Sequence, residues 1–445
     1  MKWSILFDTA VKRENFDDLS KILMSQLVRK TQKKSFIFTP ENDYFTRTQY
    51  NFCIDTSELS RNIMNRIIAY SSETLKNESD FLGKINAGDI AASSSLIAAC
   101  GLPPFGVIGE YAIRRWFSSG LKKIYFKDKP VLSHMNEHMK DDFIHYSSIA
   151  HTYRYVKRYN DSDLLFPDYI LAPVSEIRSD KSIPGCCYSE IDIMEKISQE
   201  LKIKYHHHPL SYIVNAAFYI VSVTSFFEDA VYYKLITCRD MINVLRCTEN
   251  FYEDTENDEY EEFASSVKYF EEVATGHVFS KDIDDPDAIR KWIIYVKSVM
   301  CDMVAKSFVK NYREIMTGKY ADDLISDSWC RTFRLGFDNV EKKITELSGR
   351  LHMMNVKVIK VYNYLLESFV KAVIYYDTEE KMDDDSMMLI DVIHHKYKKV
   401  YKETSCDKDE NEKLYLRIMM VLDYLTDLTD KEITELADIL RGYSI

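Results

Sequence analysis

Residues that interrupt helices are scarce in this sequence, and this scarcity restricts the fold more than any other feature. The 445 residues include only 12 glycines and 9 prolines. A chain with so few breakers favours long helices joined by few turns. Apolar residues make up 46% of the chain, which is enough to build a large core. The sequence therefore predicts a mainly helical protein.

One segment links two of the expected helices, and the other predictions are built around it. Residues 96–117 read LIAACGLPPFGVIGEYAIRRWF, and a run of small residues, Ala91–Ser95, comes just before. Small residues allow helices to approach closely, so we expect residues 85–100 to lie in the core. Apolar residues at helical spacing also predict helices over Met135–Tyr159 and from Ile289 to Met316.

Three motifs taken together resemble one family, the dGTP triphosphohydrolases of the HD superfamily. Residues 103–110 (PPFGVIGE) resemble its P-P-F-G-H-x-G-E, and residues 208–217 (HPLSYIVNAA) resemble its H-P-L-x-Y-L-x-E-A-A. Residues 423–430 (DYLTDLTD) resemble its D-[YF]-[IV]-S-G-M-T-D. The resemblance implies an all-α, HD-domain-like multi-helix fold. We expect one compact helical unit, with an HD core at 1–235 and a helical half at 236–445.

The metal ligands of that family are missing from the matching positions. Anchored on Ser60–Ile63, which resembles G-R-S-[IL], the alignment puts Phe52 where the family has its first histidine ligand. A register shifted by one residue would put Asn51 there instead. The His-Asp pair falls in a five-residue deletion between residues 100 and 101, and Phe218 stands at the last aspartate. A deletion of five residues inside a helix would rotate the downstream residues by about 500°, so we expect it to have shortened a turn.

The resemblance also locates the catalytic histidine of the family, and this chain has Val107 at that position. Only Glu110 remains of the catalytic pair, and a lone glutamate at a helix start commonly serves as a cap or dipole partner. The resemblance therefore implies a catalytically degenerate protein without a cofactor. Such a chain would be a nucleotide-binding, regulatory or assembly subunit.

Two further groups of residues keep other activities open. His134, His138 and Asp142 have the i, i+4, i+8 spacing of one helical face, which could hold a divalent metal such as Mg²⁺ or Mn²⁺. A metal there would give the alternative function, an active dNTP (dGTP) triphosphohydrolase with a relocated metal site that releases deoxynucleoside and triphosphate. Nucleotide-binding candidates, placed by the resemblance, are Arg47, His145, Arg154 and Tyr212.

Charge and cysteine content bear on partners and location. The net charge of −12 disfavours non-specific nucleic-acid binding by the whole surface. A basic cluster remains a candidate for single-stranded nucleic acid, and its residues are Arg114, Arg115, Lys122, Lys123, Lys127 and Lys129. The resemblance implies a homo-oligomer, or a hetero-oligomer with an active relative, and a dNTP as ligand.

The same totals favour a cytoplasmic protein. The nine cysteines are scattered without a C-x-x-C pair, as in proteins with reduced thiols. The N-terminal apolar run is interrupted by Asp8, so we expect no signal peptide. The most apolar run, Ile213–Phe227, is shorter than the roughly 20 residues of a membrane span.

Overall fold

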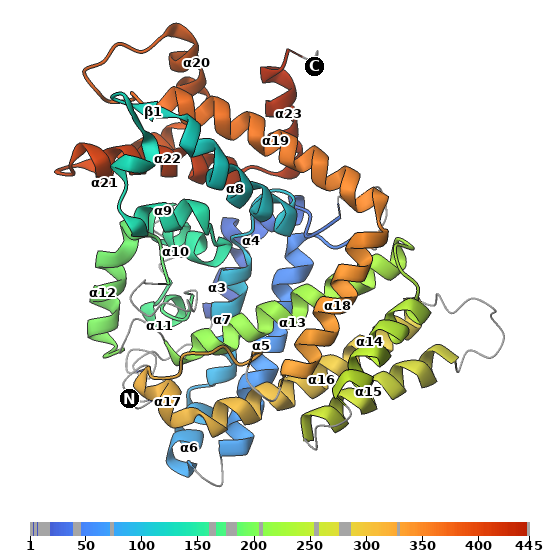
Figure 1. The fold of residues 1–445 in the computed structure, drawn as a ribbon. Coiled ribbons are helices and arrows are strands. Elements are labelled where there is room, and N and C mark those ends of the chain that lie inside the picture. Colours follow the sequence, from blue (N-terminus) through green and yellow to red (C-terminus); the bar gives the residue numbers. More distant parts are fainter. Residues whose placement is uncertain are drawn as a thin grey trace.

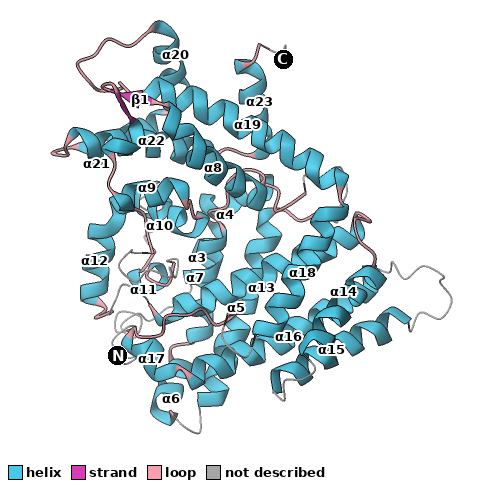
Figure 2. Ribbon diagram, in the orientation of Figure 1, coloured by secondary structure: helices cyan, strands magenta, loops and turns pink. Residues whose placement is uncertain are grey.

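The computed structural model describes residues 3, 7, 18–38, 46–71, 75–159, 166–174, 185–203, 208–252, 258–275, 286–326 and 330–442. Within these ranges the secondary structure is almost entirely helical, as Figures 1 and 2 show. The sheet content of the described chain is one short hairpin of β1 (Tyr125–Phe126) and β2 (Lys129–Pro130). The structure thus confirms the all-α prediction, while the boundary at residue 235 stays a prediction.

The first helices of the chain include the pair that lies at the centre of the protein. They are α3 (Asp18–Met24), α4 (Gln26–Lys30), the short η1 (Thr31–Lys33), α5 (Gln49–Ser71), α6 (Lys76–Lys84) and α7 (Ala87–Ala99). Helix α5 packs along α7, and every one of the small residues 91–95 of α7 is buried. The prediction that this segment lies in the core is therefore confirmed.

The middle of the chain surrounds this pair. It comprises α8 (Gly106–Gly120), η2 (Leu121–Lys123), η3 (Val131–His134), α9 (Glu137–Ile144), α10 (Ser148–Tyr159), α11 (Asp168–Leu171), η4 (Tyr188–Glu190), α12 (Ile191–Glu200) and α13 (Pro209–Tyr232). Helix α13 begins with a proline at its first turn, and the Nδ1 atom of His208 accepts a hydrogen bond from the backbone N–H of Leu210 at 3.1 Å. This start fixes where α13 enters the core beside α5 and α7.

Helix α13 is the one described helix that is long and apolar enough to cross a membrane. Of its most apolar 18-residue window, 78% is buried inside the protein. That environment is typical of the core helix of a soluble protein.

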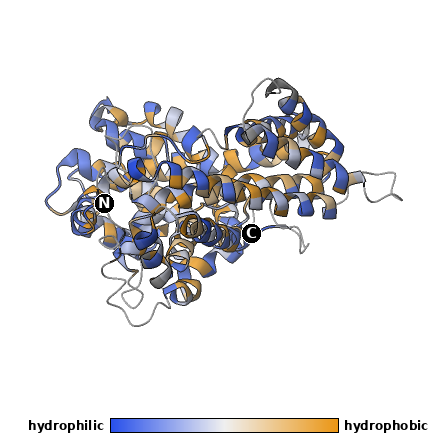
Figure 3. Cartoon of the chain, turned by 90° about the horizontal axis from the view of Figure 1, so that it is seen from below, coloured by the Kyte–Doolittle hydropathy of each residue, from blue (hydrophilic) through white to orange (hydrophobic). Residues whose placement is uncertain are grey.

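The remaining helices cover two sides of this centre. They are α14 (Cys238–Tyr252), α15 (Asp258–Thr275), α16 (Pro286–Lys310), α17 (Tyr312–Thr317), α18 (Arg331–Leu347), α19 (Gly349–Val373), α20 (Asp384–Val392), α21 (His395–Ser405), α22 (Glu410–Asp427) and α23 (Asp430–Leu440). Figure 3 shows that apolar and polar residues alternate along the helices, as in amphipathic helices that pack on a core. Helix α17 ends at Gly318, whose φ of 68° lies in the left-handed region that favours glycine.

The deletion point lies in a short turn, as the sequence predicts. Helix α7 ends at Ala99, and α8 begins at Gly106 after the two prolines. Gly106 has a φ of +55°, and a Cβ atom there would lie 1.8 Å from the carbonyl oxygen of Phe36. A Cβ on Gly109 would lie 2.0 Å from the oxygen of Pro104. Both glycines are therefore required by close backbone contacts.

The single helix expected over residues 135–159 is wrong. The chain forms α9 and α10 with a break at residues 145–147. At this break the Nε atom of Arg114 on α8 donates a hydrogen bond to the carbonyl oxygen of Tyr146 at 2.5 Å. A side chain from another helix thus satisfies a backbone group that a continuous helix would have used internally.

Candidate functional site

Aromatic rings fill the place where the resemblance locates metal ligands. The rings of Phe36 and Phe52 stack with centroids 4.1 Å apart, and Phe218 meets Phe52 edge-on at 5.0 Å. Phe36 and Phe52 are fully buried, and Phe218 is partly buried against the same core. Two residues placed there from sequence alone, Phe52 and Phe218, are therefore in direct contact.

Two buried cysteines, one on α5 and one at the end of α7, also lie close to each other. The Sγ atoms of Cys53 and Cys100 lie 3.8 Å apart, and both thiols are free and buried. Magnesium and manganese prefer carboxylate, carbonyl and water oxygens. Across the described residues, no three His, Cys, Asp or Glu side chains come together in a way that could hold a metal ion. The residues at this position thus do not fit the metal of the family.

The turn between α7 and α8 is held from several sides. The buried Gln49 donates to the carbonyl oxygens of Ser35 at 3.2 Å and Pro103 at 2.7 Å. The carboxylate of Asp430 accepts from the backbone N–H groups of Ser35 and Phe105, each at 2.8 Å. A rigid turn of this kind leaves little freedom for a ligand to reshape it.

Glu110 contributes to structure on α8. Its carboxylate pairs with Arg114 one turn further on and accepts hydrogen bonds from Ser148 at the start of α10. Burial raises the pKa of this carboxyl, and Arg114 and Ser148 partly oppose the shift. Val107, at the position of the catalytic histidine, is 43% exposed and carries no titratable group. Glu110 thus serves as a hydrogen-bond partner for the start of α10, which is a structural role.

Arg154 lies in a buried ion network. Its side chain is 1% exposed and donates to both carboxylate oxygens of Asp423, at 2.7–3.1 Å. It also donates to Glu190 and to Ser189, each at 2.9 Å. These bonds use four of the five guanidinium N–H groups.

Arg47 is also paired, at the entrance of α5. It binds Glu228, and its Nη1 atom donates to Asp229 at 2.6 Å near the end of α13. A polar pocket of about 230 Å³ opens beside it, and Arg290 also lines this pocket. Of the four nucleotide-binding candidates, Arg47 is the one that lines a described pocket.

The other two candidates lie elsewhere. Tyr212 is 1% exposed, its hydroxyl donates to the carbonyl oxygen of Tyr320 at 2.9 Å, and burial raises its pKa to about 12. The His145 side chain is 73% exposed, and its Nε2 atom lies 3.9 Å from Asp141. The structure therefore does not bring the four candidates together, and their role in nucleotide binding stays a prediction.

The alternative metal face does not form. His134 ends η3 before α9 begins, and its two ring nitrogens contact Asn411 at 3.1 Å and the oxygen of Phe126 at 3.0 Å. His138 and Asp142 lie on α9, so the three residues do not share one helix. The expected i, i+4, i+8 face is therefore wrong, because the helix starts later than the sequence pattern indicates.

Asp142 instead makes a buried connection to the C-terminal half. Its Oδ2 atom accepts from the backbone N–H of Tyr188 and from the Tyr415 hydroxyl, each at 2.7 Å. Burial raises the pKa of this carboxyl to about 7, although the two hydrogen bonds oppose the shift. The folded state therefore holds a proton that the unfolded chain releases near pH 4.

We expect this proton to make stability depend on pH. The contribution of the protonated carboxyl is fully present below pH 4 and is lost as the pH rises through 7, since the unfolded chain binds fewer protons over that range. Urea unfolding of the wild type and of Asp142→Asn between pH 4.5 and 8 measures the effect. As the pH rises, the free energy of unfolding of the wild type should fall relative to that of the variant. A difference that stays constant with pH would contradict a protonated Asp142 in the folded state.

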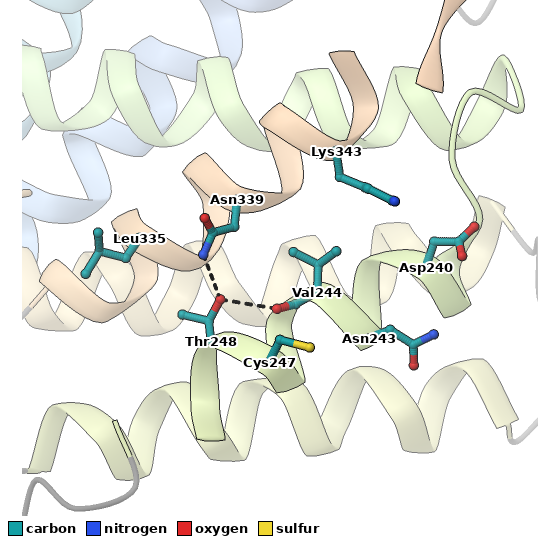
Figure 4. A pocket seen from close by; sticks show the side chains of 8 residues that line it. All are labelled: Asp240, Asn243, Val244, Cys247, Thr248, Leu335, Asn339 and Lys343. Carbon is teal, nitrogen blue, oxygen red and sulfur yellow. Dashed lines mark hydrogen bonds between the residues drawn. The ribbon is translucent and has the colours of Figure 1, made fainter. Parts of the chain in front are cut away.

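A larger pocket lies away from all of these motifs. It measures about 600 Å³ and lies between α14 and α18, with Val244 and Leu335 among its apolar lining (Figure 4). The Asn339 amide donates to the Thr248 hydroxyl at 3.0 Å across this gap. Cys247, an exposed free thiol, also lines it. The sequence gives no motif for this pocket, because its lining residues are ordinary positions on two amphipathic helices.

The comparisons with known proteins cover the whole chain. No family model matches. The "deoxyguanosinetriphosphate triphosphohydrolase-like protein" of Listeria innocua is 26% identical over 490 aligned positions, which span 100% of both chains. The protein of the same name from Listeria monocytogenes is equally similar. The "deoxyguanosinetriphosphate triphosphohydrolase" of Serratia proteamaculans is 22% identical over 72% of this chain and 68% of its own length.

Proposed function

Because the chain is a member of the dGTP triphosphohydrolase family, with relatives that align along its full length, we propose that it is a catalytically degenerate member. In this proposal it keeps the all-α fold of a family of nucleotide hydrolases. It serves as a nucleotide-binding, regulatory or assembly subunit in the cytoplasm. Its partners are further copies of itself or an active relative.

One observation carries the proposal: the contact between Phe52 and Phe218. A carboxylate in a buried site needs a metal or hydrogen bonds to offset desolvation, whereas a phenylalanine needs only packing. Stacking of Phe36 on Phe52 extends this packing. A site that binds a metal and polarises a phosphate requires several converging ligands, and the described residues here supply aromatic rings instead.

The first test is hydrolysis of dGTP and the other dNTPs with Mg²⁺, Mn²⁺ or Co²⁺, together with metal analysis of the purified protein. We expect no release of triphosphate above the buffer and less than about 0.1 equivalent of metal, an order-of-magnitude threshold for an absent site. The Serratia proteamaculans relative, assayed in parallel, provides the positive control. Metal-dependent release of triphosphate would instead establish the alternative function, an active hydrolase with ligands at other positions.

Assembly is tested separately by light scattering coupled to size-exclusion chromatography. Self-association predicts a mass at least twice the 52.2 kDa of one chain. A strictly monomeric protein that also fails to bind an active relative would contradict the assembly role.

A further inference from the structure

Two cysteines that are 47 residues apart in the sequence meet in the core. Cys53 lies on α5, and Cys100 directly follows the last residue of α7. Their Sγ atoms are 3.8 Å apart, both thiols are free, and the two residues are 0% and 4% exposed. A disulfide needs its sulfurs about 2.05 Å apart, so an approach of roughly 1.8 Å through side-chain rotation would allow the bond.

A small cavity lets a reactant reach one of the two sulfurs. It measures about 20 Å³, and Cys100 lines it together with Lys34 and His151. Lys30 also lines it and its side chain is 33% exposed, so the cavity reaches the surface. A cavity of this size holds one water-sized molecule. Hydrogen peroxide, which is only slightly larger than water, is therefore the class of oxidant that fits, whereas a bulky disulfide such as oxidised glutathione is too large.

A buried nitrogen in the lining of this cavity points to a small polar occupant. The Nδ1 atom of His151 makes no hydrogen bond within the described structure, although the residue is 3% exposed. The other ring nitrogen, Nε2, contacts the Thr426 hydroxyl at 3.1 Å. Orphaned polar atoms of this kind are rare unless water or a ligand satisfies them. A water-sized molecule in the cavity is the candidate for the missing partner.

A buried lysine favours the ionised form of these thiols, which is the nucleophilic one. The ammonium of Lys34 donates to the carbonyl oxygens of Leu102 at 3.2 Å and Thr426 at 2.8 Å, and it interacts electrostatically with both cysteines. Burial and the neighbouring thiol raise the pKa of Cys53, whereas Thr31 and Lys34 partly oppose the shift. The cation thus offsets part of the cost of forming a thiolate in the core.

We propose that Cys53 and Cys100 form a redox-active pair that hydrogen peroxide converts to a disulfide. In the first step the Cys100 sulfur attacks one peroxide oxygen, the O–O bond breaks, and the released hydroxide leaves as water with the thiol proton. In the second step the Cys53 sulfur attacks the resulting sulfenic sulfur, the S–O bond breaks, and the hydroxyl leaves as water with the second thiol proton. The two thiols lose two electrons, and one peroxide becomes two waters.

The disulfide would tie α5 to the turn that precedes α8. Cys53 directly follows Phe52, which stands where the resemblance locates a metal ligand. The redox chemistry therefore belongs to the same region as the proposed loss of catalysis, but it goes beyond that proposal. It requires no nucleotide and no metal, so its test is independent of any hydrolysis assay.

The test uses the full-length chain with Cys247→Ser and Cys406→Ser, which removes the exposed thiols and leaves seven of the nine cysteines. The folded protein is treated with hydrogen peroxide, quenched, denatured and titrated for free thiols. We expect the thiol count to fall from seven to five, and dithiothreitol to restore it. Peptide mass spectrometry without reduction should identify a cross-link between Cys53 and Cys100.

Two further variants separate this pair from general oxidation. With Cys53→Ser added, the cross-link should disappear and Cys100 should stop at the sulfenic acid, which dimedone traps. The matched control is Cys301→Ser, because Cys301 is another buried thiol, 2% exposed, and its loss should leave the cross-link unchanged. An unchanged count of seven thiols would overturn the proposal. So would a cross-link between other cysteines, such as the adjacent Cys186 and Cys187, in place of the expected one.

Discussion

Replacement of Arg154 by alanine is expected to lower the free energy of unfolding by about 3–5 kcal/mol, the usual cost of breaking a buried ion pair. The reason is that Asp423 and Glu190, both fully buried, would lose their main cation. His151, with its Nε2 atom 3.4 Å from Asp423, is held neutral chiefly by burial, which lowers its pKa. Urea unfolding followed by circular dichroism measures the loss.

The matched control for this prediction is Arg246→Ala. Arg246 also contacts two carboxylates, Glu249 and Glu271, but its side chain is 35% exposed. Water and salt screen such a pair, so we expect a loss of less than about 1 kcal/mol. Comparable losses at Arg154 and Arg246 would mean that burial is not what makes the Arg154 network important.

The second large effect is expected from Phe52→Ala, which should cost about 3–5 kcal/mol. This change would remove a fully buried ring that contacts both Phe36 and Phe218 and would leave a cavity in the core. Thermal and urea unfolding measure the effect. As a control, Tyr111→Ala removes an aromatic side chain that is 53% exposed on α8 and should change stability by less than about 0.5 kcal/mol.

A small effect of Phe52→Ala would contradict the description of this region as dry packing. It would indicate a site that already contains water and tolerates polar groups. Phe52→Leu separates the two cases, because a dry core should accept leucine far better than alanine, whereas a wet site should distinguish them little.

Local chemistry accounts for the parts of the fold that the sequence predicts. The scarcity of glycine and proline indicates long helices, and Gly318 ends α17 because it can adopt a left-handed conformation. The small residues of α7 predict close packing, because their size lets α5 approach closely. Each of these inferences depends on residues close together in the chain.

Long-range contacts explain the features that the sequence does not predict. The break after α9 depends on Arg114 from α8, so periodicity over residues 135–159 contains no sign of it. Arg154 meets Asp423 across 269 residues, and Lys30 of α4 and Lys396 of α21 both donate to Asp427 of α22. The sequence identifies these residues as charged and leaves their partners undefined. The contact of Phe52 with Phe218 could be anticipated because the resemblance assigns both to one site.

The two crowded glycines of the turn before α8 affect how this family should be surveyed. Gly106 and Gly109 admit no side chain, for steric reasons that have nothing to do with hydrolysis. A side chain at either glycine would disturb the turn itself, whereas a residue at the expected ligand positions can change without this steric penalty. A genome search that counts this signature would therefore count chains of the proposed degenerate kind among enzymes. An inventory of active members should require the histidine and aspartate ligands themselves.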